Sequence, residues 1–195
     1  MSYFAKFEKL GGAIFRFDTR IYLTNDALDS GAGKCIAAVV GKNPGSASST
    51  SFGVLSPLEL FGDNMLPSVR NRFVEAYRRA SKPVPLGAFV RIWNLFYLCD
   101  ANLQNAIRSY ESFLSPPACS SEGDDPPLVW FAWGGSHPTL DNLKKRFRDR
   151  SYPRSFFYDK KKERIVDRVP QAGDFPKHLQ GLPEEPIVEF LSKNL

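Results

Sequence analysis

Three short apolar segments, each leading into a polar or glycine-rich loop, constrain the fold of this chain more than any other feature. They cover residues 35–40, 88–98 and 128–133. Runs of this length without regular polar alternation are typical of strands that are buried on both faces of a sheet. A weaker run at 155–158, and one or two strands at a sheet edge within 13–23, complete the predicted sheet.

Segments with helical periodicity lie between these runs. Residues 67–80 place apolar side chains along one face. Further helices are expected after Asp100, after Thr139 and from Pro183. Strands that alternate with helices predict an α/β fold with a mostly parallel central sheet and helices on both faces. With 195 residues, 43% of them hydrophobic, we expect a single domain over 1–195.

Composition limits the partners and the location of the protein. The chain carries 26 Lys and Arg against 21 Asp and Glu, which favours a polyanionic partner. No stretch approaches the roughly 20 apolar residues of a membrane span, and the first residues lack the apolar run of a signal peptide. We therefore expect a cytoplasmic monomer without membrane contact. Three cysteines without paired spacing indicate neither a disulfide framework nor a zinc site.

Polar residues follow or interrupt the apolar runs where a ligand is expected. Open parallel sheets bind ligands beyond the carboxyl ends of their strands. The first run ends in Gly-Lys-Asn-Pro-Gly at 41–45, the second contains Asn94, and the third leads into Gly134 and Gly135. A buried amide without partners costs about 1 to 3 kcal/mol, so Asn94 either satisfies nearby backbone groups or faces a site. The segment 115–127, rich in Pro, Ser and acidic residues, predicts a surface loop.

The order of these motifs resembles that of the uracil-DNA glycosylase superfamily. The 41–45 loop is similar to the Gly-Ile-Asn-Pro-Gly loop of its mismatch-specific branch. Val-Arg-Ile-Trp-Asn-Leu-Phe resembles the strand with the base-reading Asn, and Leu-Val-Trp-Phe-Ala-Trp-Gly-Gly-Ser resembles the Leu-Leu-Trp-Gly strand. Lys-His-Leu-Gln-Gly occupies the place of the late histidine motif. The chain also resembles an uncharacterised bacterial family with an Asn-Pro-Ser-Thr-Ala loop.

The resemblance implies a glycosylase-like fold and a monofunctional DNA glycosylase without metal or organic cofactor. Asn43 would orient the attacking water, His178 would donate a hydrogen bond to the leaving base, and Asn94 would read the pyrimidine edge. The family's late motif is His-Pro-Ser, whereas Leu179 follows His178. His137 precedes a proline but comes directly after the Trp-Gly strand, so both histidines remain candidates, with His178 favoured.

The remaining contacts are assigned by position. The base pocket is expected to include Gly41, Lys42, Gly45, Phe52 and Asn94. The DNA-binding surface is expected to include Ser46, Gly135, Ser136, His137 and Lys177. In uracil-specific members a tyrosine fills the place of Gly45. The glycine predicts room for a 5-substituted pyrimidine, such as the hydroxymethylated or glucosylated cytosine of phage DNA, and hence a role in antiphage defence.

Three other interpretations stay open. The protein could read modified or damaged bases without cleaving them, or it could be a nucleotide-binding enzyme that uses the loop from Gly41 as a phosphate loop. Lys42 beside Asn43 also permits a Schiff-base lyase. The DNA partner would be a duplex with an extruded base or a single strand.

Overall fold

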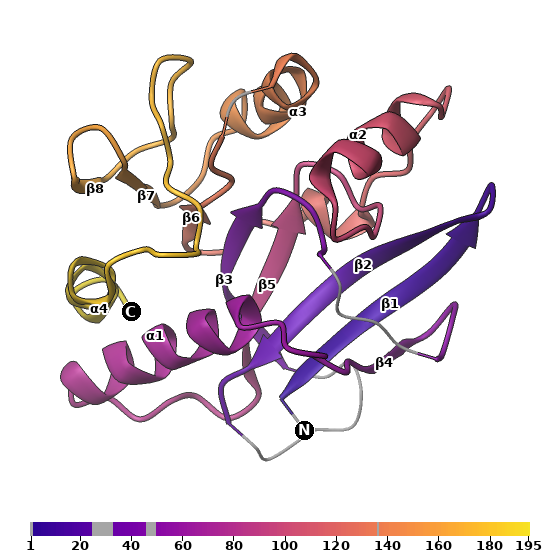
Figure 1. Cartoon of the computed structure of the whole chain (residues 1–195). Coiled ribbons are helices and arrows are strands. Elements are labelled where there is room, and N and C mark those ends of the chain that lie inside the picture. Colours follow the sequence, from indigo (N-terminus) through magenta and orange to yellow (C-terminus); the bar gives the residue numbers. More distant parts are fainter. Residues whose placement is uncertain (1, 25–32, 46–49, 136) are drawn as a thin grey trace.

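The computed structural model describes residues 2–24, 33–45, 50–135 and 137–195. Within these residues the chain forms one eight-stranded sheet, in the order β4-β1-β2-β5-β3-β6-β7-β8, and four α-helices (Figure 1). The strands are β1 (Tyr3–Leu10), β2 (Ala13–Tyr22), β3 (Lys34–Gly41), β4 (Leu55–Pro57), β5 (Ala88–Asn94), β6 (Val129–Phe131), β7 (Ser155–Asp159) and β8 (Arg164–Val166). The helices are α1 (Met65–Arg79), α2 (Leu103–Glu111), α3 (Pro138–Arg148) and α4 (Glu184–Ser192).

The sheet is mixed, so the expectation of a mostly parallel sheet is wrong. The central strands β5, β3, β6 and β7 are parallel to one another, whereas β4, β1 and β2 on one side and β8 on the other pair antiparallel. The reason is an N-terminal hairpin that turns at Gly11 and Gly12, whose φ angles of 55° and 80° suit a tight two-residue turn. The hairpin places β2 between β1 and β5, in the interior of the sheet rather than at its edge.

Helices cover both faces of the sheet, as the sequence predicted. The face under α1 and α4, here called the α1 face, carries a core that includes Val39, Ile92 and Phe73. The opposite face, under α2 and α3 and here called the α3 face, carries Trp93 and Phe147. Figure 1 shows the two helix pairs on opposite sides of the sheet. Because side chains alternate along a strand, each residue of β5 can be assigned to one face.

The helices begin close to the expected residues, with different caps. The Asp63 carboxylate accepts the Met65 N–H at 2.7 Å at the start of α1. The cap of α2 is Asn102 rather than Asp100, because the Asn102 side chain accepts from two backbone N–H groups. Pro138 is the first residue of α3, so Thr139 lies inside this helix. None of the helices in the described ranges has the length and apolar character that a membrane crossing requires.

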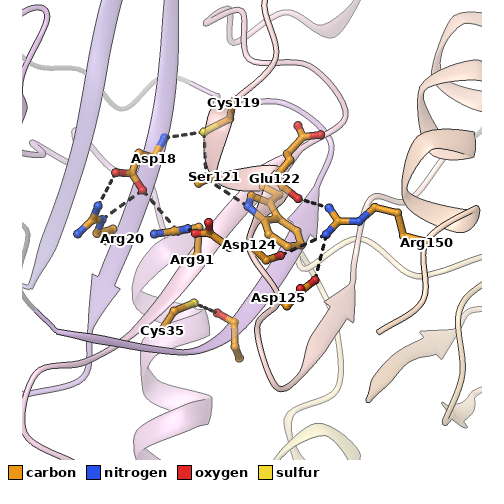
Figure 2. A network of polar contacts seen from close by, with 12 residues as sticks. Asp18, Arg20, Cys35, Arg91, Cys119, Ser121, Glu122, Asp124, Asp125 and Arg150 are labelled. Atoms are coloured by element: carbon orange, nitrogen blue, oxygen red, sulfur yellow. Dashed lines mark hydrogen bonds and ion pairs between the residues drawn. The ribbon is translucent and has the colours of Figure 1, made fainter. Parts of the chain in front are cut away.

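The segment 115–127 lies at the surface, with most of its residues exposed, and contacts the α3 face through buried residues such as Cys119 and Ser121. It contains a short 3-10 turn, Ser120–Gly123. Arg91 of β5 forms ion pairs with Asp124 of this segment and, at 3.4 Å, with Asp18 of β2 (Figure 2). The Trp93 indole N–H donates to the Ser121 hydroxyl at 3.4 Å. The acidic residues of this segment therefore help to hold it against the sheet.

Candidate functional site

The carboxyl ends of β3 and β5 meet at two residues that the sequence motifs singled out. Gly41 pairs with Asn94 in the parallel register. The pairing continues past the strands, because the Leu95 N–H donates to the Gly41 carbonyl at 3.1 Å and the Phe96 N–H donates to the Lys42 carbonyl at 3.4 Å. The loop after β3 and the turn after β5 thus form one backbone unit.

Asn94 is the most unusual polar residue of this unit. It is 1% exposed, and among the described residues neither its Nδ2 nor its Oδ1 has a hydrogen-bond partner. Oδ1 lies 3.0 Å from the point that a Cβ on Gly41 would occupy, so glycine leaves the room that the amide uses. A buried amide without partners is unfavourable by about 1 to 3 kcal/mol. Asn94 therefore offers one donor and one acceptor to a complementary ligand.

Arg146 of α3 fixes the turn that carries Asn94. Its guanidinium donates to the Leu95 carbonyl at 2.7 Å and to the Asn94 carbonyl at 2.9 Å. The Glu122 carboxylate accepts from Arg146 Nε at 3.0 Å and from the Tyr97 hydroxyl at 2.5 Å. Nothing in the sequence distinguishes Arg146, because one basic residue among several on a helix predicts a solvated face.

Asn43 has one end of its amide anchored. Its Nδ2 donates to the Asp100 carbonyl at 3.0 Å. A carbonyl can only accept, so this contact identifies the nitrogen end of the amide. The oxygen Oδ1 is then the end that can accept a hydrogen bond from a water.

Lys42 lies beside the glycines that follow β6. Its Nζ is 3.5 Å from the point that a Cβ on Gly135 would occupy. Lys144 of α3 donates to the Gly135 carbonyl at 2.9 Å and pairs with Asp141 at 2.7 Å. Burial, followed by the charge of Lys144, lowers the pKa of Lys42 from its ordinary value. Two ammonium groups thus lie near the carboxyl end of β6.

His178 packs against the same turn. A Cβ on Gly134 would lie 2.7 Å from the Cβ of His178, and Gly134 has a φ of +55°, so both space and backbone geometry favour glycine. Burial, followed by the charge of Lys42, lowers the pKa of His178, which favours a neutral imidazole. Its Nδ1 accepts from the Gln180 N–H at 3.2 Å. The ring proton is therefore on Nε2, which can donate to a ligand.

A pocket of about 500 Å³ opens between the start of α1 and the loop of His178. Asp63, Asn64 and Arg72 line it on the α1 side, and His178 and Gln180 line it on the other. A volume of this size is typical of pockets that bind small molecules. Among the predicted site residues, His178 lines this pocket, whereas Lys42, Asn43 and Asn94 do not.

The other predicted site residues are less closely grouped. A Cβ on Gly45 would meet no atom of the described residues within 4 Å, and the φ of +74° favours glycine there. Phe52 lies under Lys9 of β1, with 4.6 Å from Nζ to the ring centroid, and β2 separates β1 from the strand of Asn94. Lys177 lies beside β7, because its N–H donates to the Tyr158 carbonyl at 2.8 Å.

His137 is the N-cap of α3, and its Nδ1 is buried without a hydrogen-bond partner. Ser46 and Ser136 lie outside the described residues. Among the residues that the structure describes, no group of three or more His, Cys, Asp or Glu side chains could hold a metal ion.

Comparisons of the chain with protein-family models, with curated proteins and with solved structures give no match in any of the three.

Proposed function

We propose that the chain is a monofunctional DNA glycosylase, which hydrolyses the N-glycosidic bond of a pyrimidine nucleotide extruded from DNA and leaves an abasic site. One observation carries the proposal: Asn94 holds a buried donor and a buried acceptor, both without partners, at the carboxyl end of β5. The edge of a pyrimidine presents the complementary acceptor and donor. Binding such a base would satisfy the amide.

The neighbouring residues suit the chemistry of this reaction. The transition state carries positive charge on the sugar and negative charge on the departing base. Asn43 Oδ1 positions the water, since its Nδ2 is held by Asp100. His178 donates from Nε2 to the base. An amide is a weak base, so positioning and electrostatic stabilisation supply most of the rate.

The proposed substrate is a 5-substituted pyrimidine, in duplex DNA with the base extruded or in a single strand. The support is the space at Gly45, where a Cβ would meet no atom within 4 Å in the part of the chain that the structure describes. A site without a steric barrier rejects bulk poorly. Hydroxymethylated or glucosylated cytosine of phage DNA fits this description, and its removal would act as antiphage defence.

The test uses oligonucleotides that each carry one unusual base, in single-stranded and duplex form, followed by alkaline cleavage of abasic sites. We expect base release by the wild type and a loss of about 100-fold or more in Asn43→Ala at nearly unchanged DNA affinity, because the water is positioned mainly in the transition state. Asn105→Ala, an exposed change on α2, is the matched control and should retain wild-type rates.

Other outcomes would contradict the proposal. Tight binding of one modified DNA without release of its base would favour a non-catalytic reader. Hydrolysis of free nucleotides would favour the nucleotide-binding enzyme.

A further inference from the structure

Arg16 of β2 is another buried residue whose side chain has no hydrogen-bond partner among the described residues. It is 0% exposed, and Nε, Nη1 and Nη2 all lack a hydrogen-bond partner. A buried charge without a partner is far more unfavourable than a buried neutral amide, and arginine keeps its charge in proteins. A residue with only a structural role would be expected to have a carbonyl or carboxylate within reach.

The side chain of Arg16 points to the α1 face, the same face as Asn94. Its neighbours in β2, Phe15 and Phe17, belong to the core of the α3 face, so alternation directs Arg16 to the other side. Its partner across β1 is Phe7, which belongs to the core of the α1 face. In β5, Trp93 belongs to the α3 face, which directs Asn94 to the α1 face.

The backbone places Arg16 beside the candidate site. The Arg16 N–H donates to the Tyr97 carbonyl at 2.9 Å, on the other side of the turn that binds Gly41 and Lys42. Burial lowers the pKa of Arg16, and the charges of Cys99 and Asp63 oppose this effect in part. Asp63 lines the pocket together with His178.

The charges around this position favour an anionic ligand. Lys42, Lys144 and Arg16 bring positive charge to the carboxyl ends of the strands, and the Lys144 charge is paired with Asp141. Asp63 is the acidic residue that lines the pocket, and its carboxylate already accepts the Met65 N–H of α1. A neutral ligand would leave the Arg16 guanidinium without a hydrogen-bonded anion, whereas an oxyanion would bind it and compensate its charge.

We propose that Arg16 is a further catalytic residue of this site, whose guanidinium binds the pyrimidine as it leaves with a negative charge. This inference rests on the proposed glycosylase function. The bond between C1′ and N1 breaks with both electrons on the base, and the oxygen of water bonds to C1′. The proton that the water loses finally neutralises the base anion. The cation is thus matched to charge that exists only as the bond breaks.

A binding experiment tests the charge preference without requiring turnover. Barbiturate is a planar pyrimidine that is an anion at neutral pH, and uracil is its neutral counterpart. We expect wild-type protein to bind free barbiturate about 10- to 100-fold more tightly than free uracil, measured by calorimetry. Arg16→Met should abolish the preference, and Arg16→Lys, which keeps the charge, should retain part of it.

The control is Arg91→Met, which removes a buried arginine from the α3 face and should keep the preference. Equal binding of the two pyrimidines by the wild type, or an unchanged preference in Arg16→Met, would overturn the inference. Failure of the proposed function looks different: the wild type would release no base from any DNA, whatever its preference among free pyrimidines.

The rate of base release adds a readout that a merely structural residue would not change. Fluorine at C5 makes a uracil anion a better leaving group. Arg16→Met should therefore lower the rate of uracil release from DNA by about 100-fold or more. The loss in the rate of 5-fluorouracil release should be at least about tenfold smaller. Equal losses for both bases would indicate a structural role and contradict the inference.

Discussion

Arg91 and Arg16 lie on neighbouring strands of one sheet, on opposite faces, and differ in what surrounds their charges. Arg91 is 6% exposed and forms ion pairs with Asp18 and Asp124, as Figure 2 shows. Arg16 is 0% exposed, and its guanidinium has no hydrogen-bond partner among the described residues. The same side chain is thus part of a polar network on the α3 face and without partners on the α1 face.

This difference indicates that the polar groups of the α3 face stabilise the fold, whereas those of the α1 face belong to the candidate site. On the α3 face the segment 115–127 supplies acidic partners for Arg91, Arg146 and Arg150, namely Asp124, Glu122 and Asp125. On the α1 face, near the carboxyl end of β5, the Asn94 amide and the Arg16 guanidinium have no hydrogen-bond partner among the described residues. Buried polar groups are normally satisfied, and exceptions concentrate at functional sites. The two faces therefore predict opposite responses to the same substitution.

The largest expected effect is on the paired arginine. Arg91→Met should lower the free energy of unfolding by about 2 to 3 kcal/mol, because it leaves Asp18 and Asp124 without their buried partner, with some screening by solvent at Asp124. Arg16→Met should leave it unchanged or raise it, because a buried charge without a partner is removed. Urea denaturation of both variants measures the difference. Equal losses in the two variants would show that Arg16 is also paired in solution.

The second effect concerns Arg146, which lies on α3 and binds the backbone of the turn that carries Asn94. Arg146→Met should lower the free energy of unfolding by about 1 to 2 kcal/mol, because the Asn94 and Leu95 carbonyls lose a charged donor. It should also slow base release, since the Asn94 turn loses its support. The control on the same helix is Arg148→Met, which we expect to change either quantity little. If base release is unchanged in Arg146→Met, the hydrogen bonds from Arg146 to the Asn94 and Leu95 carbonyls do not position Asn94 for the reaction.

The third effect compares a satisfied with an unsatisfied asparagine. Asn102→Leu should cost about 1 kcal/mol of stability, because its side chain caps α2. Asn94→Leu should stabilise the fold or leave it within about 1 kcal/mol, and should abolish base release. Thermal unfolding and the alkaline cleavage assay measure the two quantities. A marked loss of stability in Asn94→Leu would mean that the amide has a structural partner.

The smallest effect is the pH dependence at His178. Its pKa in the folded state is lowered from 6.5, so the unfolded state binds the proton more readily. Stability from this residue is fully present above about pH 6.5 and falls as the pH drops below it. His178→Gln should make the decline between pH 7.5 and 5.5 shallower, as measured by urea denaturation. His137→Gln is the matched variant. A shallower decline in His137→Gln but not in His178→Gln would contradict the assignment of the pH dependence to His178.

The sequence was most informative where a residue type conflicted with its surroundings. Asn94 could be singled out because an amide interrupts an apolar run, and the paired run at 35–40 placed Gly41 beside it. The apolar runs themselves predicted β3, β5, β6 and β7 closely. The Gly-Gly dipeptide at 11–12 was a hairpin signal between β1 and β2 that was missed, which is why the antiparallel part of the sheet was not expected.

Arg16 could not be singled out in the same way. In Ala-Ile-Phe-Arg-Phe it occupies the polar position of an alternating pattern, which predicts exposure to solvent. The structure buries it because α1 covers that face of the sheet. Local periodicity assigns a side chain to a face, but only the tertiary packing decides whether that face meets water.

The short outer strands of the sheet have a consequence for how the protein behaves at high concentration. β4 and β8 have three residues each, and β4 ends in Pro57, which has no N–H to donate. Long unpaired edges are the templates on which other chains add strands, and short, charged or proline-bearing edges resist this. Lysines at 160–162 and Arg164 add charge beside β8. We therefore expect the sheet to resist edge-to-edge aggregation, although it spans eight strands.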